Sequence, residues 1–299
     1  MFIVAHRRFF FWLTGLILAA AIGAIVVWGL PLGIDFTGGS SLQVSYDSGR
    51  PELSSIQERV GGVIDGVASV RAFGEEGVSI RTRSLTPTEH VNVLAAIAFD
   101  APARELSFTS VGPALGDQFT RKALWAIAAV MLAVVLYIAF VFRKVSRPVP
   151  SWGYGMVAIS MLIIDIIVPV GFFAALAHYT GAEVDSLFVV ALLALLGYVM
   201  NDIIVVFDRV REHLARNERE GGTKEPFEVT VGKSIDETIM RSINTSLTTA
   251  LVLVALIYFG AEATRTFALV MLVGVIAGTF SSICRSAPLL IPIARHFTK

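Results

Sequence analysis

The chain has 299 residues but only one cysteine and few charged side chains. A single cysteine, Cys284, excludes an intramolecular disulfide and any cysteine-cluster metal site. Lys, Arg, Asp and Glu make up 16% of the sequence, and 24 basic residues balance 24 acidic ones. With a formal net charge of zero, the chain has no overall field that would favour nucleic acid as a partner.

Motifs of nucleotide hydrolysis and of metal-dependent catalysis are also missing. The sequence has no Walker-type phosphate loop, no His-Glu-x-x-His pair and no histidine beside a plausible nucleophile. The histidines lie outside the apolar stretches without metal-ligand spacing, at His6, His90, His178, His213 and His296. We therefore expect no enzyme, no cofactor and no bound metal. A transmembrane potential, worth about 2.3 kcal/mol per charge per 100 mV, is an alternative source of energy.

What the sequence does have is long apolar stretches. Hydrophobic residues make up 55% of the chain, and the mean hydropathy is +0.72. Because a spanning helix needs about 20 mainly apolar residues, we predict six transmembrane helices. The stretches run approximately over Phe9–Leu30, Leu124–Phe142, Met156–Ala177, Leu187–Phe207, Ile239–Gly260 and Phe267–Ile293.

The first stretch resembles a signal peptide in having Arg7 and Arg8 before it. However, its apolar run exceeds the 7 to 15 residues of a signal core, and no polar cleavage region follows. We therefore predict an uncleaved membrane anchor.

Basic residues near short loops favour the cytoplasmic side of a membrane. Residues 178–185 contain no Lys or Arg, and the turn near Glu262 has only Arg265. The other loops and both ends are richer in basic residues: Arg7, Arg8, Arg143, Lys144, Arg147, Arg209, Arg211, Arg216, Arg219, Lys224, Lys233, Arg295 and Lys299. This pattern predicts that both termini are cytoplasmic and that the long segment 31–122 lies outside.

The long outer segment has the periodicity and turn signals of a small soluble domain. Thr86 and Glu89 have capping-box spacing at the start of a helix, and residues 74–77 fit a hairpin turn. Alternating and helical periodicities predict the order β-α-β-β-α-β, with elements near 41–46, 51–64, 67–73, 78–83, 86–97 and 105–111. This is the order of a ferredoxin-like split β-α-β unit, a topology that indicates no particular function.

The predicted fold class is therefore an α-helical membrane protein with one small α+β domain between helices 1 and 2. We assign residues 1–32 to the N-terminus and helix 1, 33–122 to the ferredoxin-like extracytoplasmic domain, and 123–299 to helices 2–6, with a cytoplasmic loop over 208–238. The membrane part is either a complete six-helix bundle or half of a twelve-helix unit.

The fourth apolar stretch contains two adjacent polar residues, Asn201 and Asp202. An Asp near a helix centre costs roughly 2.5 to 3.5 kcal/mol on insertion scales, so it is a candidate proton or ion site. Arg241, at the start of the antiparallel fifth span, is its candidate partner. The alternative is a permanent ion pair that only fixes helix packing.

Three further intramembrane features have open interpretations. Asp165 in the third span is a second candidate proton site or a buried structural carboxyl. Arg285, in the sixth span, reaches either a partner subunit or the cytoplasmic interface. Small and hydroxylated residues favour close helix packing or a hydrated path past Asp202: Gly274, Gly278, Ser242, Thr245, Ser246, Thr248 and Thr249.

Four motifs together resemble the SecF members of the SecD/SecF family of protein-export membrane proteins, part of the RND superfamily. They match in order and spacing across essentially the whole chain: Gly33–Gly39 (GIDFTGG), Ser110–Pro113 (SVGP), Gly197–Glu212 (GYVMNDIIVVFDRVRE) and Ile243–Thr249 (INTSLTT). The resemblance implies half of an RND-type transporter in the bacterial cytoplasmic membrane. It also implies the partners SecD, which supplies six more spans, the SecYEG translocon, YajC, YidC, protons and a translocating polypeptide.

The resemblance also assigns residues. It places the family's fourth-span acid on Asp202 and its fifth-span arginine on Arg241, and it implies that proton flow drives outer-domain movement. Family members often have Thr or Ser where this chain has Ile203, and His where it has Ile164, which weakens the assignment of Asp165 as a proton carrier. We expect Gly33, Gly38 and Gly39, with Asp35 between them, to form a hinge.

Two other function classes fit parts of the pattern. A free-standing RND-like exporter of lipids or small molecules would share the carboxylate, but an outer segment of about 90 residues is too small to form a substrate chamber. A passive scaffold subunit would need no intramembrane charge.

Overall fold

The computed structural model describes residues 2–47, 49–66, 68–74, 76–98, 102–143, 148–219 and 225–297. Four basic residues used above to predict the orientation lie outside these ranges: Lys144, Arg147, Lys224 and Lys299. The chain forms two compact units. The helical unit comprises Met1–Leu30, Trp125–Ala182 and Leu187–Lys299, and the α+β unit comprises Pro31–Leu124 and Glu183–Ser186.

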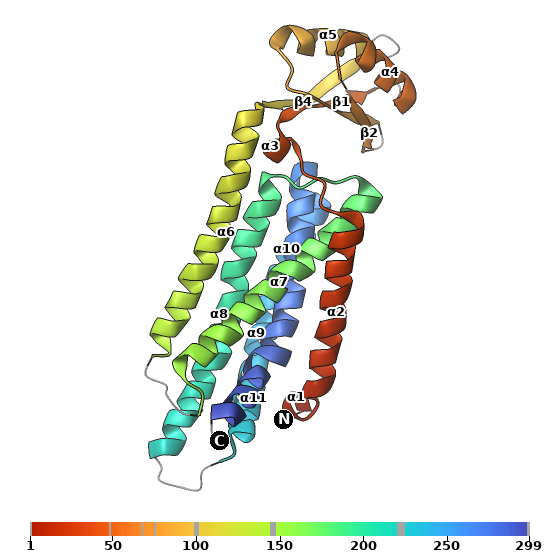
Figure 1. Ribbon diagram of the computed structural model, residues 1–299. Helices are drawn as coiled ribbons and strands as arrows, with labels where there is room; N and C mark the ends of the chain where they lie inside the picture. Colours follow the sequence, from red (N-terminus) through yellow and green to blue (C-terminus); the bar gives the residue numbers. More distant parts are fainter. Residues whose placement is uncertain are drawn as a thin grey trace. The chain divides into compact units, whose positions relative to one another are not determined.

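Six helical segments are long and apolar enough to span a membrane, as predicted (Figure 1). After the short α1 (Phe2–Ala5), they are α2 (Arg7–Trp28), α6 (Pro113–Val141), α7 (Ser151–Thr180), α8 (Ser186–Arg219), α9 (Phe227–Phe259) and a last span made of α10 (Glu262–Ser281), the π-helix η1 (Ser282–Ser286) and α11 (Ala287–Phe297). Several helices extend beyond the predicted apolar runs; α8, for example, continues from Phe207 to Arg219.

Small residues allow the helices of this unit to approach closely. A Cβ at Gly171 in α7 would lie 2.5 Å from the Cα of Ala21 in α2. In α10, a Cβ at Gly274 or Gly278 would overlap the side chains of Leu195 and Val199 in α8. The small-xxx-small spacing predicted for α10 therefore faces α8, the helix that carries Asp202.

The α+β unit contains one antiparallel sheet with the strand order β2-β3-β1-β4. Its elements follow the predicted order after one extra helical turn: α3 (Ile34–Thr37), β1 (Gly39–Tyr46), α4 (Leu53–Val63), β2 (Ser69–Phe73), β3 (Gly77–Thr82), α5 (Pro87–Ile97) and β4 (Ala103–Val111). This order is compatible with a split β-α-β arrangement.

The core of the α+β unit lies between the sheet and its two helices. Alternate residues of β1, among them Val44 and Tyr46, are fully buried, as the period of a strand requires. From the helices, Ile56, Val60 and Val93 join the same cluster. The predicted capping box forms at the start of α5, where the Thr86 hydroxyl and the Glu89 carboxylate each accept a hydrogen bond from the other residue's backbone N–H.

Candidate functional site

Asp202 lies on the buried side of α8, and only 6% of its surface is exposed. The same face of α8 carries Leu195 and Val199, which pack against the glycines of α10. An acidic side chain is therefore held inside the helical unit rather than at its surface. Its neighbour Asn201 points away and is exposed.

Two residues of α9 act on the Asp202 carboxylate. Arg241 is its charged neighbour, and the Ser242 hydroxyl lies beside it. Arg241 of α9 thus lies near enough to Asp202 of α8 for their charges to interact, although no ion pair or hydrogen bond joins the two side chains within the described residues. Ser242 is 1% exposed and its Oγ has no hydrogen-bond partner within the described part of the chain.

A second polar layer lies one helical turn further along these helices. The Tyr198 hydroxyl of α8 donates to Ser246 Oγ in α9 at 3.4 Å, and Thr279 Oγ1 of α10 donates to the same oxygen at 2.5 Å. Three helices are therefore joined by hydroxyl groups next to Asp202. Such interhelical hydrogen bonds each contribute about 0.6 to 2 kcal/mol in membrane proteins.

The buried hydroxyl groups of α9 form a longer row than the sequence analysis recognised. They recur at every fourth residue, at Thr230, Ser234, Thr238, Ser242 and Ser246, and each is 7% exposed or less. Thr248, by contrast, is exposed, and Thr245 and Thr249 are only partly buried. The predicted hydroxyl cluster therefore divides between two faces, and the i, i+4 spacing from Thr230 was the signal that could have shown the buried one.

Polar side chains also lie on the exposed face of α9. Arg241, Asn244 and Thr248 are exposed there, near the middle of a 33-residue helix. Asn201 adds a further exposed amide on α8. Asn244 and Thr248 lie within the apolar run that begins at Ile239, where hydrocarbon is a poor solvent for polar groups, whereas Arg241 lies near the end of that run. Nothing in the described part of the chain covers these side chains.

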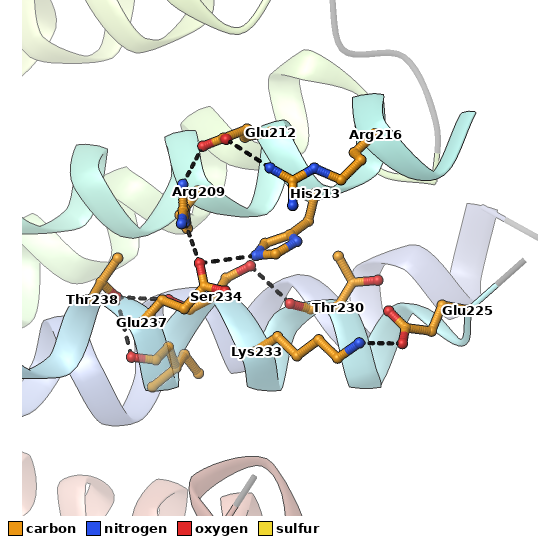
Figure 2. A network of polar contacts seen from close by, with 11 residues as sticks. Arg209, Glu212, His213, Arg216, Glu225, Thr230, Lys233, Ser234, Glu237 and Thr238 are labelled. Carbon is orange, nitrogen blue, oxygen red and sulfur yellow. Dashed lines mark hydrogen bonds and ion pairs between the residues drawn. The ribbon is translucent and has the colours of Figure 1, made fainter. Parts of the chain in front are cut away.

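Charged residues connect the far ends of α8 and α9 (Figure 2). The Arg209 guanidinium of α8 pairs with Glu237 of α9 through Nε and with Glu212 through Nη1 at 2.5 Å. His213 Nε2 lies 3.2 Å from the same Glu237 carboxylate. This network joins α8 to α9 just beyond Phe207, where the predicted fourth span ends.

Asp165 is 2% exposed in α7, and neither carboxylate oxygen accepts a hydrogen bond within the described residues. Its charged neighbour is Arg285 of the π-helix η1, and Ser281 lies beside it. The Ser281 hydroxyl itself bonds Met161 Sδ at 3.2 Å, which aligns α10 with α7. The charged neighbour of Arg285 is therefore Asp165 of the same chain, an option that the sequence analysis did not include.

The predicted hinge residues lie in the α+β unit and differ from one another in conformation. Gly38 has φ +73° and Gly39 has φ +128°, angles that favour glycine. Gly33 has φ −76°, which any residue can adopt. A glycine is required there by the lack of space, because a Cβ would lie 2.7 Å from the Val184 carbonyl oxygen. Asp35 Oδ2 accepts a hydrogen bond from the Ser186 backbone N–H at 2.8 Å.

The sequence analysis missed the contribution of residues 183–186. This connection between α7 and α8 belongs to the α+β unit, whereas the predicted domain division assigned it to the membrane part. Glu183 pairs there with Arg71 and Arg81. Its sequence context, a short polar loop, contains no signal for these long-range contacts.

Six apolar helices, one of which carries a buried carboxylate, and a small α+β unit define the chain as a multi-pass membrane protein. Residues 92–296 match the family described as protein export membrane protein SecD/SecF, C-terminal, and residues 23–49 match the SecD/SecF GG motif. The chain belongs to the SecD/SecF family of protein-export membrane proteins.

Relatives and solved structures agree with this assignment. The chain is 37% identical to protein translocase subunit SecF of Thermobaculum terrenum, over 97% of this chain and 92% of that one. It is 32% identical to the SecF of Sebaldella termitidis, over 98% and 91%. The crystal structure of SecDF from Thermus thermophilus, a translocon-associated membrane protein, matches with a TM-score of 0.82 at 28% identity, covering 97% of this chain and 38% of that chain. SecDF in a super-membrane-facing form matches with a TM-score of 0.67 at 28% identity, covering 98% and 38%.

Proposed function

We propose that this chain works as a SecF-like subunit that uses the proton-motive force to promote polypeptide export. Protonation and deprotonation of Asp202, opposite Arg241, change the packing of α8 and α9, and this change drives movement of the α+β unit. The observation that carries the proposal is the buried Asp202 carboxylate with the charge of Arg241 and the Ser242 hydroxyl beside it. One proton that crosses a 100 mV potential releases about 2.3 kcal/mol.

The exposed polar face of α9 supports a partner with its own intramembrane polar groups. Arg241 and Asn244 would otherwise face lipid. We propose SecD as this partner, supplying six further spans, because the chain covers only 38% of the SecDF chain that it matches. SecYEG, YajC and YidC are proposed as further members of the assembly. A free-standing exporter is disfavoured, since a single copy leaves this face without a cover.

The remaining features fit the same function. We place the chain in the bacterial cytoplasmic membrane with both termini cytoplasmic, so the α+β unit meets the emerging polypeptide outside. The two solved SecDF forms match this chain with TM-scores of 0.82 and 0.67 at equal identity and similar coverage. Such a difference supports movement within proteins of this kind. Energy would come from protons without nucleotide hydrolysis by this chain.

The test is Asp202→Asn in vesicles that contain this chain, SecD and SecYEG. Asn keeps the size of the side chain but removes its titration, so proton-dependent stimulation of secretion should disappear. Asp208→Asn is the matched control, because Asp208 lies on the same helix and is exposed. Intact stimulation in the Asp202→Asn complex refutes the proposal.

A double substitution separates a proton site from a permanent ion pair. If Asp202 and Arg241 only fix packing, then replacing both by Leu should leave assembly and secretion intact, since apolar replacements of buried ion pairs are often tolerated. We expect normal assembly with SecD and loss of proton-dependent secretion.

A further inference from the structure

We infer that Asp35 and Glu183 are positioning residues that transmit movement between the α+β unit and the helix that carries Asp202. This inference rests on the proposed function. Its basis is the segment Glu183–Ser186, which connects α7 to α8 in sequence but belongs to the α+β unit. Three independent sets of contacts hold this segment in place.

The first set is a short backbone pairing with the residues that follow α2. The Val184 N–H donates to the Pro31 carbonyl at 2.8 Å, and the Gly33 N–H donates to the Val184 carbonyl at 2.8 Å. Leu32 and Val184 form a parallel β-bridge between them. Because a Cβ at Gly33 would lie 2.7 Å from the Val184 oxygen, any larger residue would push the two segments apart. Gly33 therefore keeps this pairing closed.

The second set is a helix cap supplied from far away in the sequence. Ser186 is the first residue of α8, and its N–H donates to Asp35 Oδ2 at 2.8 Å. The first N–H groups of a helix have no partner within the helix, and a negative charge near them is stabilising. A cap normally comes from the residue just before the helix. Here it comes from the motif that leads into β1, so the start of α8 is bound to that motif.

The third set ties the same segment to the sheet. The Glu183 carboxylate pairs with Arg71 of β2 at 3.2 Å and with Arg81 of β3. The Glu183 side chain is only 11% exposed, so solvent screens these pairs less than ordinary surface pairs. Burial and the nearby Arg71 lower the pKa of Arg81 to about 10, which leaves it charged at neutral pH. Glu183 offsets the repulsion between the two guanidinium groups, and Asp185 and Asp35 add further negative charge near Arg81.

Helix continuity makes these contacts relevant to the proton site. α8 runs from Ser186 through Asp202 as one unbroken helix, a length of about 24 Å at 1.5 Å per residue. No loop intervenes that could absorb a displacement. A shift or rotation of α8 caused by a change at Asp202 therefore acts directly on the Asp35 cap and on the Glu183 pairs.

The experiment measures proton uptake and polypeptide translocation separately in vesicles containing this chain, SecD and SecYEG. For Asp35→Ala and Glu183→Gln we expect proton uptake to persist while translocation falls about tenfold, within the range of typical coupling between sites. Asp35→Asn keeps an oxygen acceptor for the Ser186 N–H and should retain most of the coupling. Glu58→Ala, at an exposed position of α4, is the control and should match the parent.

Several outcomes overturn the inference. It fails if Asp35→Ala and Glu183→Gln translocate like the control, or if uptake and translocation fall in a fixed ratio, as a merely structural role predicts. A failure of the proposed function is distinguishable, because Asp202→Asn would then leave both quantities unchanged.

A disulfide between the segment after α2 and the segment before α8 provides a second test of the inference. The same test applies where a variant of Asp35 or Glu183 assembles poorly. Partners in a β-bridge lie at a separation that suits a disulfide. Leu32→Cys with Val184→Cys, in a chain carrying Cys284→Ala and Asp35→Ala, should recover coupling when oxidised and lose it when reduced. If the oxidised form shows no recovery, the inference is wrong.

Discussion

The contact between α2 and α7 offers a sharp test of how the helical unit is held together. α2 exposes most of its surface, and its approach to α7 depends on Gly171, whose Cβ position is occupied by the α2 backbone. In Gly171→Ala the new methyl group would lie 2.5 Å from the Cα and Cβ of Ala21 and 2.6 Å from its carbonyl oxygen. Carbon atoms normally approach to about 3.5 to 4.0 Å, so the overlap is roughly 1 to 1.5 Å.

Two opposing effects decide the sign of this change. Ala is better than Gly inside a helix by about 1 kcal/mol. Overpacking costs typically 1 to 3 kcal/mol, and here the obstacle is backbone, which has no alternative rotamer. Because the backbone cannot move aside, we place the overpacking cost at about 2 to 3 kcal/mol, and we therefore expect Gly171→Ala to destabilise the chain by about 1 to 2 kcal/mol net. Ala21→Gly should not rescue it fully, because the Cα and carbonyl contacts remain.

The measurement is the free energy of unfolding of the full chain in mixed micelles, titrated with a denaturing detergent. Gly155→Ala is the matched control, since Gly155 is a buried residue of the same helix with nothing within 4 Å of its Cβ position. The control should be neutral or slightly more stable than the parent. Equal stability of the two variants would refute the steric reasoning.

Two further predictions concern the α+β unit. The side-chain hydrogen bond from Arg83 lowers the pKa of Glu89 to about 2, so its contribution to stability is present above the unfolded pKa of about 4.3 and is lost as pH falls toward 2. Glu89→Gln should therefore flatten the pH dependence of hydrogen-exchange protection in α5 between pH 5 and pH 2, and an unchanged profile would contradict this. Gly39→Ala should destabilise the unit by about 1 to 3 kcal/mol more than Gly66→Ala in thermal unfolding. Both glycines have φ near +125°, but only a Cβ at Gly39 meets an obstacle, 2.6 Å away at the Thr82 carbonyl oxygen, so equal losses would contradict this reason.

Structural features that depend on local or periodic sequence patterns could be predicted from the sequence. Six apolar runs predicted six spans because hydrocarbon thickness sets a minimum length, and Thr86 with Glu89 predicted a cap because its geometry spans only four residues. The proximity of Asp202 to Arg241 could be expected from helix order, since consecutive spans joined by a loop must run antiparallel. Their roles in proton coupling remain a proposal.

Contacts between segments far apart in the sequence could not be predicted. Asp35 caps α8 from 151 positions earlier, and nothing in either local sequence encodes that approach. Arg285 was left without a partner because its neighbour Asp165 lies on another helix, and the π-helix that presents it has no simple sequence signature. Gly33 was predicted to be a hinge on the basis of glycine's flexibility, whereas its φ is ordinary and its role in the fold is to leave room for Val184.

The exposed polar face of α9 has a consequence for the synthesis of the protein. A chain made without a partner leaves Asn244 and Thr248 exposed within the apolar run of the fifth span, where hydrocarbon does not solvate polar groups. Assembly with a partner that has polar groups opposite this face would give these side chains the neighbours that lipid lacks. The complex would therefore be favoured over the separate subunit as soon as both are in the membrane.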